Sequence, residues 1–239
     1  MPEPLQAGLW GLVAAGALPL GALIALFVPV PRKTVALVLA FGAGALVSAL
    51  SFDLAEEAFR VGGTLVFGAG LAVGALAYYA GDRLIDRLSP GKGVRRTTGG
   101  PAIVLGALLD GLPESLVLGA TLIGGAGVSP SFLAAVLVSN LPEGLAGGRD
   151  LSEEGHPKRF VIGLWVAVAI ASGIVAAIGN AGLSAMAPGL LAFIQALAAG
   201  AIITMLADTM FPEAFRDGGE TAGLATALGF ATAFLLSRT

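Results

Sequence analysis

The chain has 239 residues, of which 56% are hydrophobic and only 12% are charged, against roughly 25% charged residues in an average soluble domain. The mean hydropathy is +0.89 and the net charge is −3. These values exclude a disordered chain, a coiled coil and a nucleic-acid binder. The absence of cysteine excludes a disulfide framework, and the single histidine excludes motifs that need several histidines. The composition therefore predicts an all-α integral membrane protein that lies in the lipid bilayer.

A membrane-spanning helix requires about 20 mostly apolar residues. The sequence contains eight such stretches, which we predict as transmembrane helices near residues 8–29, 34–52, 62–81, 101–123, 130–147, 160–180, 187–210 and 219–237. Because they leave no room for a soluble domain, we expect residues 1–239 to form a single transmembrane domain. No Lys or Arg precedes the first stretch, so we do not expect a cleaved signal peptide.

The basic residues predict the orientation of these helices. Of the 13 Lys and Arg residues, all except Arg60 and Arg238 fall in loops on one side of the predicted helices. The third loop is the richest, with Arg83, Arg87, Lys92, Arg95 and Arg96. Since cytoplasmic loops carry an excess of Lys and Arg, the odd-numbered loops are expected in the cytoplasm. Both termini are then expected outside the cell inner (plasma) membrane.

An internal repeat pairs residues 43–63 with residues 199–219 without gaps. The two copies share Ala-Gly-Ala at their starts, Glu-Ala-Phe-Arg near their ends and a final Gly-Gly pair. They lie on the second and seventh predicted helices, which cross the membrane in opposite directions. The repeat therefore predicts a 3+2+3 layout, with an inverted repeat of helices 1–3 and 6–8 around helices 4–5. Inverted repeats are typical of secondary transporters.

A second, shorter repeat lies on the two central helices. Asp110-Gly-Leu-Pro-Glu-Ser115 on the fourth helix resembles Ser139-Asn-Leu-Pro-Glu-Gly144 on the fifth. Each copy places a Pro-Glu pair inside an apolar stretch.

Four acidic residues, Asp110, Glu114, Glu143 and Asp208, lie in the interior of the predicted helices, and no Lys or Arg lies within them. An ionised Asp at the centre of a membrane helix costs about 2.5–3.5 kcal/mol, so four unpaired carboxylates would cost on the order of 10 kcal/mol. They must be protonated, hydrated or neutralised by a bound cation. Asp53, at the outer end of the second helix, is a candidate entrance residue.

The spacing of the polar residues brings them onto common helix faces. Asp110 and Glu114 are four residues apart, and Asn140 and Glu143 are three apart, so each pair shares a face. The prolines that precede the two glutamates free one backbone carbonyl each, which is tolerated at membrane depth where the carbonyl faces a cavity or an ion. With the hydroxyl of Ser139, these oxygens predict a site for a divalent cation at the membrane midplane.

These motifs and the predicted layout resemble the ZIP family of divalent metal transporters over nearly the whole chain. The resemblance implies transport of zinc, manganese, iron or cadmium toward the cytoplasm, through metal ligands on helices 4 and 5. Residue by residue, Glu114 and Glu143 match the glutamates of the family motifs, and Asn140 matches the metal-binding position after the histidine of helix 5.

The chain departs from the family pattern at several metal-binding positions. Asp110 and Ser139 stand where the family has histidines, and Gly111 replaces an asparagine. The glutamate of helix 6, expected near Ala176, is absent, and Asp208-Thr209 stands near the His-Glu pair of helix 7. We therefore interpret Asp110, Glu114, Ser139, Asn140, Glu143 and Asp208 as the candidate metal ligands.

Other interpretations of these residues remain open. The polar cluster could hold helices together by hydrogen bonds alone. A ZIP-like protein that binds or senses metal without transporting it would use the same ligands. An intramembrane aspartyl protease could pair Asp110 with Asp208, but such enzymes need a Gly-x-Gly-Asp context that is absent here. We expect a transporter and no enzyme. Small residues spaced as in Gly70 and Gly74 would permit a homodimer without requiring one.

The loss of imidazole ligands leads to a first prediction. Oxygen donors favour harder ions, so excess Mn²⁺ should inhibit uptake of labelled Zn²⁺ more strongly than excess Zn²⁺ inhibits uptake of labelled Mn²⁺. Competition assays with the reconstituted protein measure this preference. A strong preference for Zn²⁺ would contradict it.

Overall fold

The computed structural model describes residues 1–88, 100–125 and 127–238, without the side chains of residues 86, 88 and 100–104. The described residues form helices and no strands. The α-helices are α1 (Glu3–Ala15), α2 (Ala17–Phe27), α3 (Arg32–Ala49), α4 (Glu56–Leu88), α5 (Gly100–Thr121), α6 (Pro130–Glu153), α7 (Lys158–Leu183), α8 (Pro188–Met205), α9 (Phe211–Gly218) and α10 (Thr221–Leu236). The described residues also contain two π-helical turns, η1 (Leu50–Ala55) and η3 (Leu206–Met210), and one 3₁₀ turn, η2 (Ile123–Gly125).

Four helical runs among the described residues are long and apolar enough to cross a membrane. They are Glu3–Phe27, Arg32–Ile85, Lys158–Leu183 and Pro188–Gly218. Helix α6 has 24 residues, but Ser139, Asn140 and Glu143 interrupt its apolar stretch. Helix α10 is apolar but has only 16 residues. Helix occupies most of each stretch predicted from the sequence, and the apolar helices fit a membrane protein.

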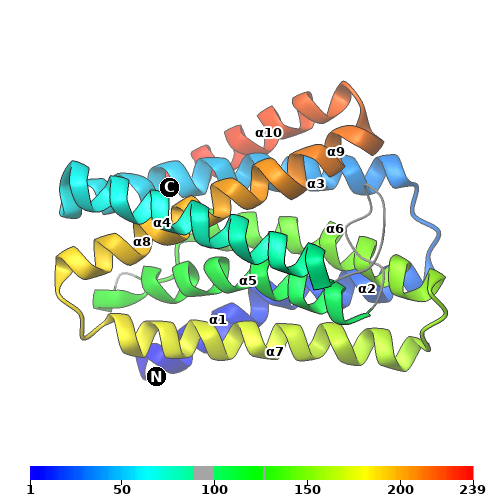
Figure 1. The fold of residues 1–239 in the computed structure, drawn as a ribbon, viewed down its shortest axis with the longest axis horizontal. Helices are drawn as coiled ribbons and strands as arrows, with labels where there is room; N and C mark the ends of the chain where they lie inside the picture. The colour runs from blue at the N-terminus through cyan, green and yellow to red at the C-terminus, as the bar shows by residue number, and fades with distance from the viewer. Residues whose placement is uncertain (89–99, 126, 239) are drawn as a thin grey trace.

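The run Arg32–Ile85 reverses direction within its length. Figure 1 shows α3 and α4 lying antiparallel, and Gly63 has φ 68° and ψ −176°, outside the helical region. Glycine is the residue that adopts such angles readily, because it has no Cβ. Gly219, with φ 61° and ψ −151°, similarly separates α9 from α10. Two glycines therefore set the chain reversals on which the helix packing depends.

The helices form two groups with α5 and α6 between them (Figure 1). In one group α4 packs along α8, and α3 along α10; in the other, α1 and α2 pack against α7. Helix α6 contacts both α2 and α3, while α5 contacts α7 and α8. Glycine allows close approach of the backbones. Where α2 meets α6, a methyl group on Gly144 would overlap the backbone of Leu18, and one on Gly21 would overlap that of Leu141.

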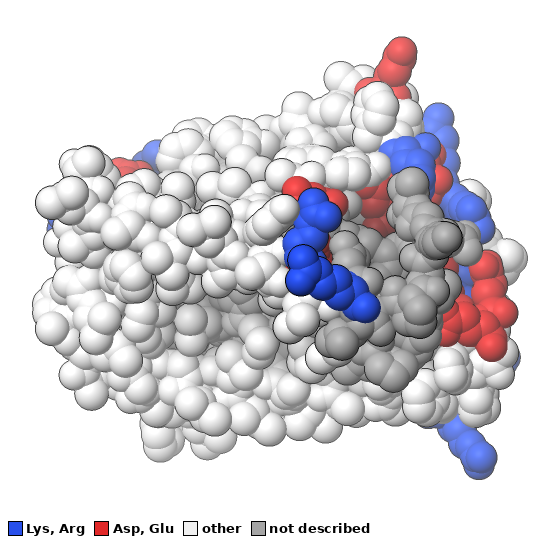
Figure 2. All heavy atoms as spheres, viewed as in Figure 1, with Lys and Arg blue, Asp and Glu red and all other residues white. Residues whose placement is uncertain are grey.

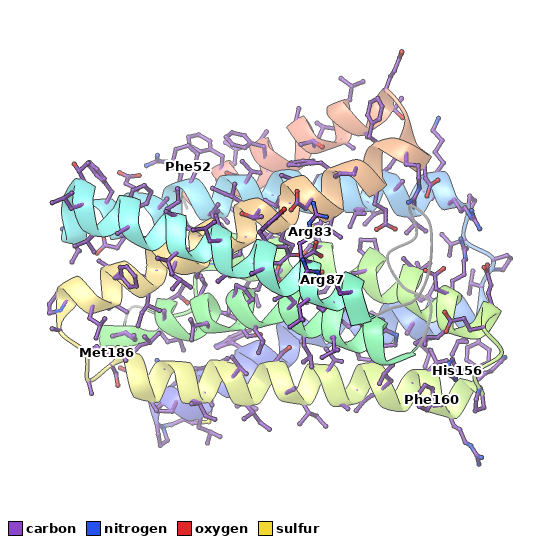
Figure 3. The ribbon with its side chains drawn as sticks, in the orientation of Figure 1. Phe52, Arg83, Arg87, His156, Phe160 and Met186 are labelled. Atoms are coloured by element: carbon purple, nitrogen blue, oxygen red, sulfur yellow. The ribbon has the colours of Figure 1, made fainter. Side chains whose placement is uncertain are left out.

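On the face that Figure 2 draws, charged residues gather toward one end of the molecule. On the face drawn in Figure 2, most coloured residues lie in the right half, which holds the turn between α6 and α7, and the left half is almost entirely white. Arg83 and Arg87, expected in a loop, lie instead on α4, which continues to Leu88 (Figure 3). The guanidinium of Arg83 lies 5.1 Å from the ring centre of Tyr79, one turn earlier, which favours the longer helix. The predicted loop residues Lys92, Arg95 and Arg96 lie outside the described residues.

The backbone at Gly63 yields a prediction about stability. Alanine at this position would be forced into a conformation that only glycine adopts easily, at a cost of about 1–3 kcal/mol. Gly63→Ala should therefore lower the unfolding temperature of the purified protein in detergent. Gly68→Ala is the matched control, because Gly68 is helical and has no neighbouring atom within 4 Å of an added methyl group. It should leave the unfolding temperature unchanged or raise it. Equal destabilisation by both variants would contradict the assignment.

Candidate metal site

A cavity of about 160 Å³ lies among α4, α5 and α6, and side chains from α3, α7, α8, η3 and α9 complete its described lining. One water molecule occupies about 30 Å³ of liquid volume, so this cavity has room for an ion with several of its waters. Its described lining is rich in acids: Asp82, Asp110, Glu114, Glu143, Asp150 and Glu213. The cavity is therefore an acidic space inside an otherwise apolar helical protein.

Four of the predicted ligands line this cavity together. Asp110 and Glu114 come from α5, and Ser139 and Glu143 come from α6. Glu114 is 3% exposed. Among the described residues, no hydrogen-bond donor and no basic side chain contacts Glu114 or Glu143. Two carboxyl groups thus face the cavity without a protein partner.

The carboxylates surround the cavity without converging on one point. In the part of the chain that the structure describes, no three His, Asp or Glu side chains lie close enough together to hold an ion jointly. The convergence expected from the spacing is therefore not present in this arrangement. Like charges repel, and Glu143 interacts electrostatically with Asp110 and Glu114. A cation in the cavity could be bound through one or two carboxylates and several waters, as Mg²⁺ commonly is.

The structure places Asn140 away from the cavity. Its side chain is 4% exposed, and its Nδ2 donates a hydrogen bond of 3.1 Å to the backbone oxygen of Ala14 in α1. Asn140 is not among the residues that line the cavity. In this arrangement it connects α6 to α1, which is the hydrogen-bonded helix contact considered as the alternative for this cluster.

Asp208 and Asp53 also lie outside the cavity lining. Asp208 is exposed in η3, where Thr209 and Met210 face the cavity instead. Asp53, in η1, accepts hydrogen bonds from Ser131 Oγ and, at 2.7 Å, from Ser129 Oγ. Asp53 therefore connects η1 to the start of α6.

Sequence reasoning missed Tyr78, which lies beside Asp110. Tyr78 is 2% exposed, and its hydroxyl donates a hydrogen bond of 2.5 Å to Oδ1 of Asp110. The tyrosine comes from α4, 32 positions away in sequence. No local motif indicates this neighbour, because the contact depends on how α4 packs against α5.

Three further acids of the lining, Asp82, Asp150 and Glu213, were also not predicted as ligands. A signal for two of them was available in the spacing. Asp82 is four residues after Tyr78, and Asp150 is seven residues after Glu143, so each shares a helix face with a residue of the cavity. Both follow the predicted helices 62–81 and 130–147, whereas α4 and α6 continue through them.

Comparison with known protein families finds no family model that matches the chain, and comparison with curated proteins finds no match. The resemblance to the ZIP family therefore rests on the motifs described above.

The lining of the cavity predicts which acid is needed for a cation to stabilise the folded protein. Mn²⁺ should raise the unfolding temperature of the wild-type protein in detergent, because a ligand at about 100 times its dissociation constant stabilises the folded state by about 2.7 kcal/mol. Glu114→Gln should lose most of this increase, since it removes a buried carboxylate from the cavity wall. Asp208→Asn is the matched control and should keep it. The site assignment fails if the loss occurs in the control and not in Glu114→Gln.

Proposed function

We propose that this protein transports a divalent metal cation of the zinc, manganese, iron or cadmium class across the inner membrane toward the cytoplasm. The observation that carries the proposal is the acidic cavity within an apolar helical protein, in which Glu114 and Glu143 have no partner among the described residues. A buried carboxylate without a partner is costly, and a doubly charged cation in the cavity would offset that cost.

The direction of the cavity supports release into the cytoplasm. Its lining extends along α6 from Ser139 to Asp150 and reaches Asp82 near the end of α4 and Glu213 on α9. This is the end of the molecule at which the charged residues gather (Figure 2). The distribution of basic residues in the sequence assigns that end to the cytoplasm, with both termini outside. The cavity is then an inward-facing one, and a cation would leave along the acids at its mouth.

The backbone supports the inverted repeat. In the ungapped alignment of residues 43–63 with 199–219, the first residue of η1, Leu50, aligns with the first residue of η3, Leu206. Gly63 aligns with Gly219, and both have positive φ. Departures from α-helix thus occur at matching positions, as expected of two related structural units.

The helix packing around the two copies of the repeat, residues 43–63 and 199–219, also matches. A methyl group on Gly44 of α3 would overlap the backbone of Thr226 in α10, and one on the aligned Gly200 of α8 would overlap that of Leu71 in α4. The pair α3–α10 therefore resembles the pair α8–α4. This favours the eight-helix, 3+2+3 layout, in which α5 and α6 carry the site and the outer helices rock against them to open each side in turn.

The two alternative functions, a metal sensor and an aspartyl protease, require different arrangements of the acids. A metal sensor would use the same cavity without moving the ion, and the departures from the ZIP pattern leave this as the second candidate. The protease alternative needs Asp110 and Asp208 close together. It is disfavoured, because Asp208 is exposed and lies outside the cavity that Asp110 lines. We propose a carrier with no enzymatic activity.

Uptake into liposomes tests the proposal. Liposomes that contain the purified protein should accumulate Mn²⁺ faster than empty liposomes, and Glu143→Gln should lower the rate at least about tenfold, by loss of a carboxylate that is worth more than 1.4 kcal/mol to the bound ion. Asp208→Asn should transport at the wild-type rate.

The other outcomes separate the candidates. Binding of Mn²⁺ without uptake would favour the sensor. Absence of both binding and uptake for Mn²⁺, Zn²⁺, Fe²⁺ and Cd²⁺ would overturn the proposed function.

A further inference from the structure

Tyr78 joins three helical segments at the cavity. Its hydroxyl lies 2.5 Å from Oδ1 of Asp110 in α5 and 3.3 Å from the hydroxyl of Thr209 in η3. All three residues line the cavity. The tyrosine itself is 2% exposed, so its ring is held by packing and its hydroxyl has a fixed position.

The direction of these hydrogen bonds follows from proton counting. A phenol has one proton to donate, and Tyr78 donates it to Asp110. Thr209 must therefore donate to Tyr78 across the second contact. The resulting chain runs from Thr209 to Tyr78 to Asp110, and both hydroxyls act in the same direction. A hydrogen bond to a charged group is stronger than one between neutral groups, which fixes the orientation of the Asp110 carboxylate.

This orientation has a consequence for a bound cation. Oδ1 of Asp110 accepts the hydrogen bond of Tyr78 at one of its two lone-pair sites. Coordination of one ion by both oxygens of Asp110 would therefore compete with that hydrogen bond. Ca²⁺ takes six to eight oxygen ligands and often uses both oxygens of a carboxylate. Ions with octahedral coordination, such as Mn²⁺, are satisfied with one oxygen from each carboxylate.

We propose that Tyr78 is a positioning residue that selects the transported ion: it holds Asp110 in a one-oxygen binding mode, which favours Mn²⁺ and similar ions over Ca²⁺. This inference rests on the proposed function, since it assumes that Asp110 binds the transported cation. Thr209 supports the same arrangement by holding the hydroxyl of Tyr78, and it links the site to the π-helical turn η3 in the helical run Pro188–Gly218.

Substitution of the tyrosine tests this role. Tyr78→Phe keeps the ring and removes the hydroxyl that donates a hydrogen bond to Oδ1 of Asp110. Loss of a group that orients a metal ligand typically lowers metal affinity about 10- to 100-fold. The apparent affinity for Mn²⁺ should fall by that factor, and the ratio of Ca²⁺ to Mn²⁺ uptake into liposomes should rise at least about tenfold. A general packing defect would lower both rates and leave the ratio unchanged.

The chain offers matched controls for this experiment. Tyr79→Phe makes the same chemical change at the neighbouring position, where the side chain is 48% exposed, and it should leave the ratio at the wild-type value. Thr209→Val removes the second hydroxyl and should shift the ratio in the same direction as Tyr78→Phe, by less. Thr209→Ser keeps a hydroxyl and should restore the wild-type ratio.

A spectroscopic measurement gives a readout that does not depend on transport. Tyr78 and Tyr79 are the two tyrosines of the chain, so Tyr78 is the sole tyrosine in Tyr79→Phe. Addition of Mn²⁺ to this variant should change the near-ultraviolet absorbance of the tyrosine, because the hydrogen bond to Asp110 changes when the ion binds.

The outcomes distinguish the two proposals. If wild-type protein transports Mn²⁺ but Tyr78→Phe keeps the wild-type affinity and Ca²⁺ to Mn²⁺ ratio, the role of Tyr78 is refuted and the proposed function stands. If Mn²⁺ neither binds to nor crosses liposomes with the wild-type protein, the proposed function fails and takes this inference with it.

Discussion

The burial of Glu114 without a basic partner among the described residues is the constraint on which the rest of this structure depends. Glu114 is 3% exposed, and no described donor contacts it. In an apolar bundle such a carboxyl group must be protonated, hydrated or neutralised by a cation. Water or an ion requires a space that the surrounding helices leave open. The cavity between α4, α5 and α6 is that space. The two central helices that carry the acids are accordingly covered by neighbours on both sides (Figure 1).

Small residues make this covering compact. Where α2 crosses α6, Gly21 and Gly144 bring the two backbones into direct contact, because any side chain there would overlap the opposite helix. Dispersion forces and close packing, rather than the hydrophobic effect, hold helices together in lipid. The high glycine content of the chain, 36 residues, is therefore part of how the bundle closes around a polar centre.

Among the described residues, the acids that line the cavity extend toward one end of the molecule only. Its acids continue toward the charged end of the molecule through Asp150 and Glu213. At the opposite end, Asp53 is held by the hydroxyls of Ser129 and Ser131 at the start of α6. The proposed carrier would need one of its two end states to be open along acids on one side and hydrogen-bonded on the other. The matched irregular turns η1 and η3 lie on the two helices that flank the central pair.

Composition and periodicity were sufficient for some of these features. Apolar runs predicted the helices, because length and hydropathy are local properties. Helical spacing also placed Asp110 with Glu114 on one face, and both line the cavity. The hydrogen bond from Tyr78 to Asp110 and the contact of Asn140 with Ala14 depend on which helices touch and at what rotation.

Only the tertiary structure decided those contacts. Asp208 is exposed while its neighbour Thr209 lines the cavity with Met205 and Glu213. Helical spacing groups those three residues on one face, but which face of the run Pro188–Gly218 meets the cavity depends on how it packs against α4 and α5.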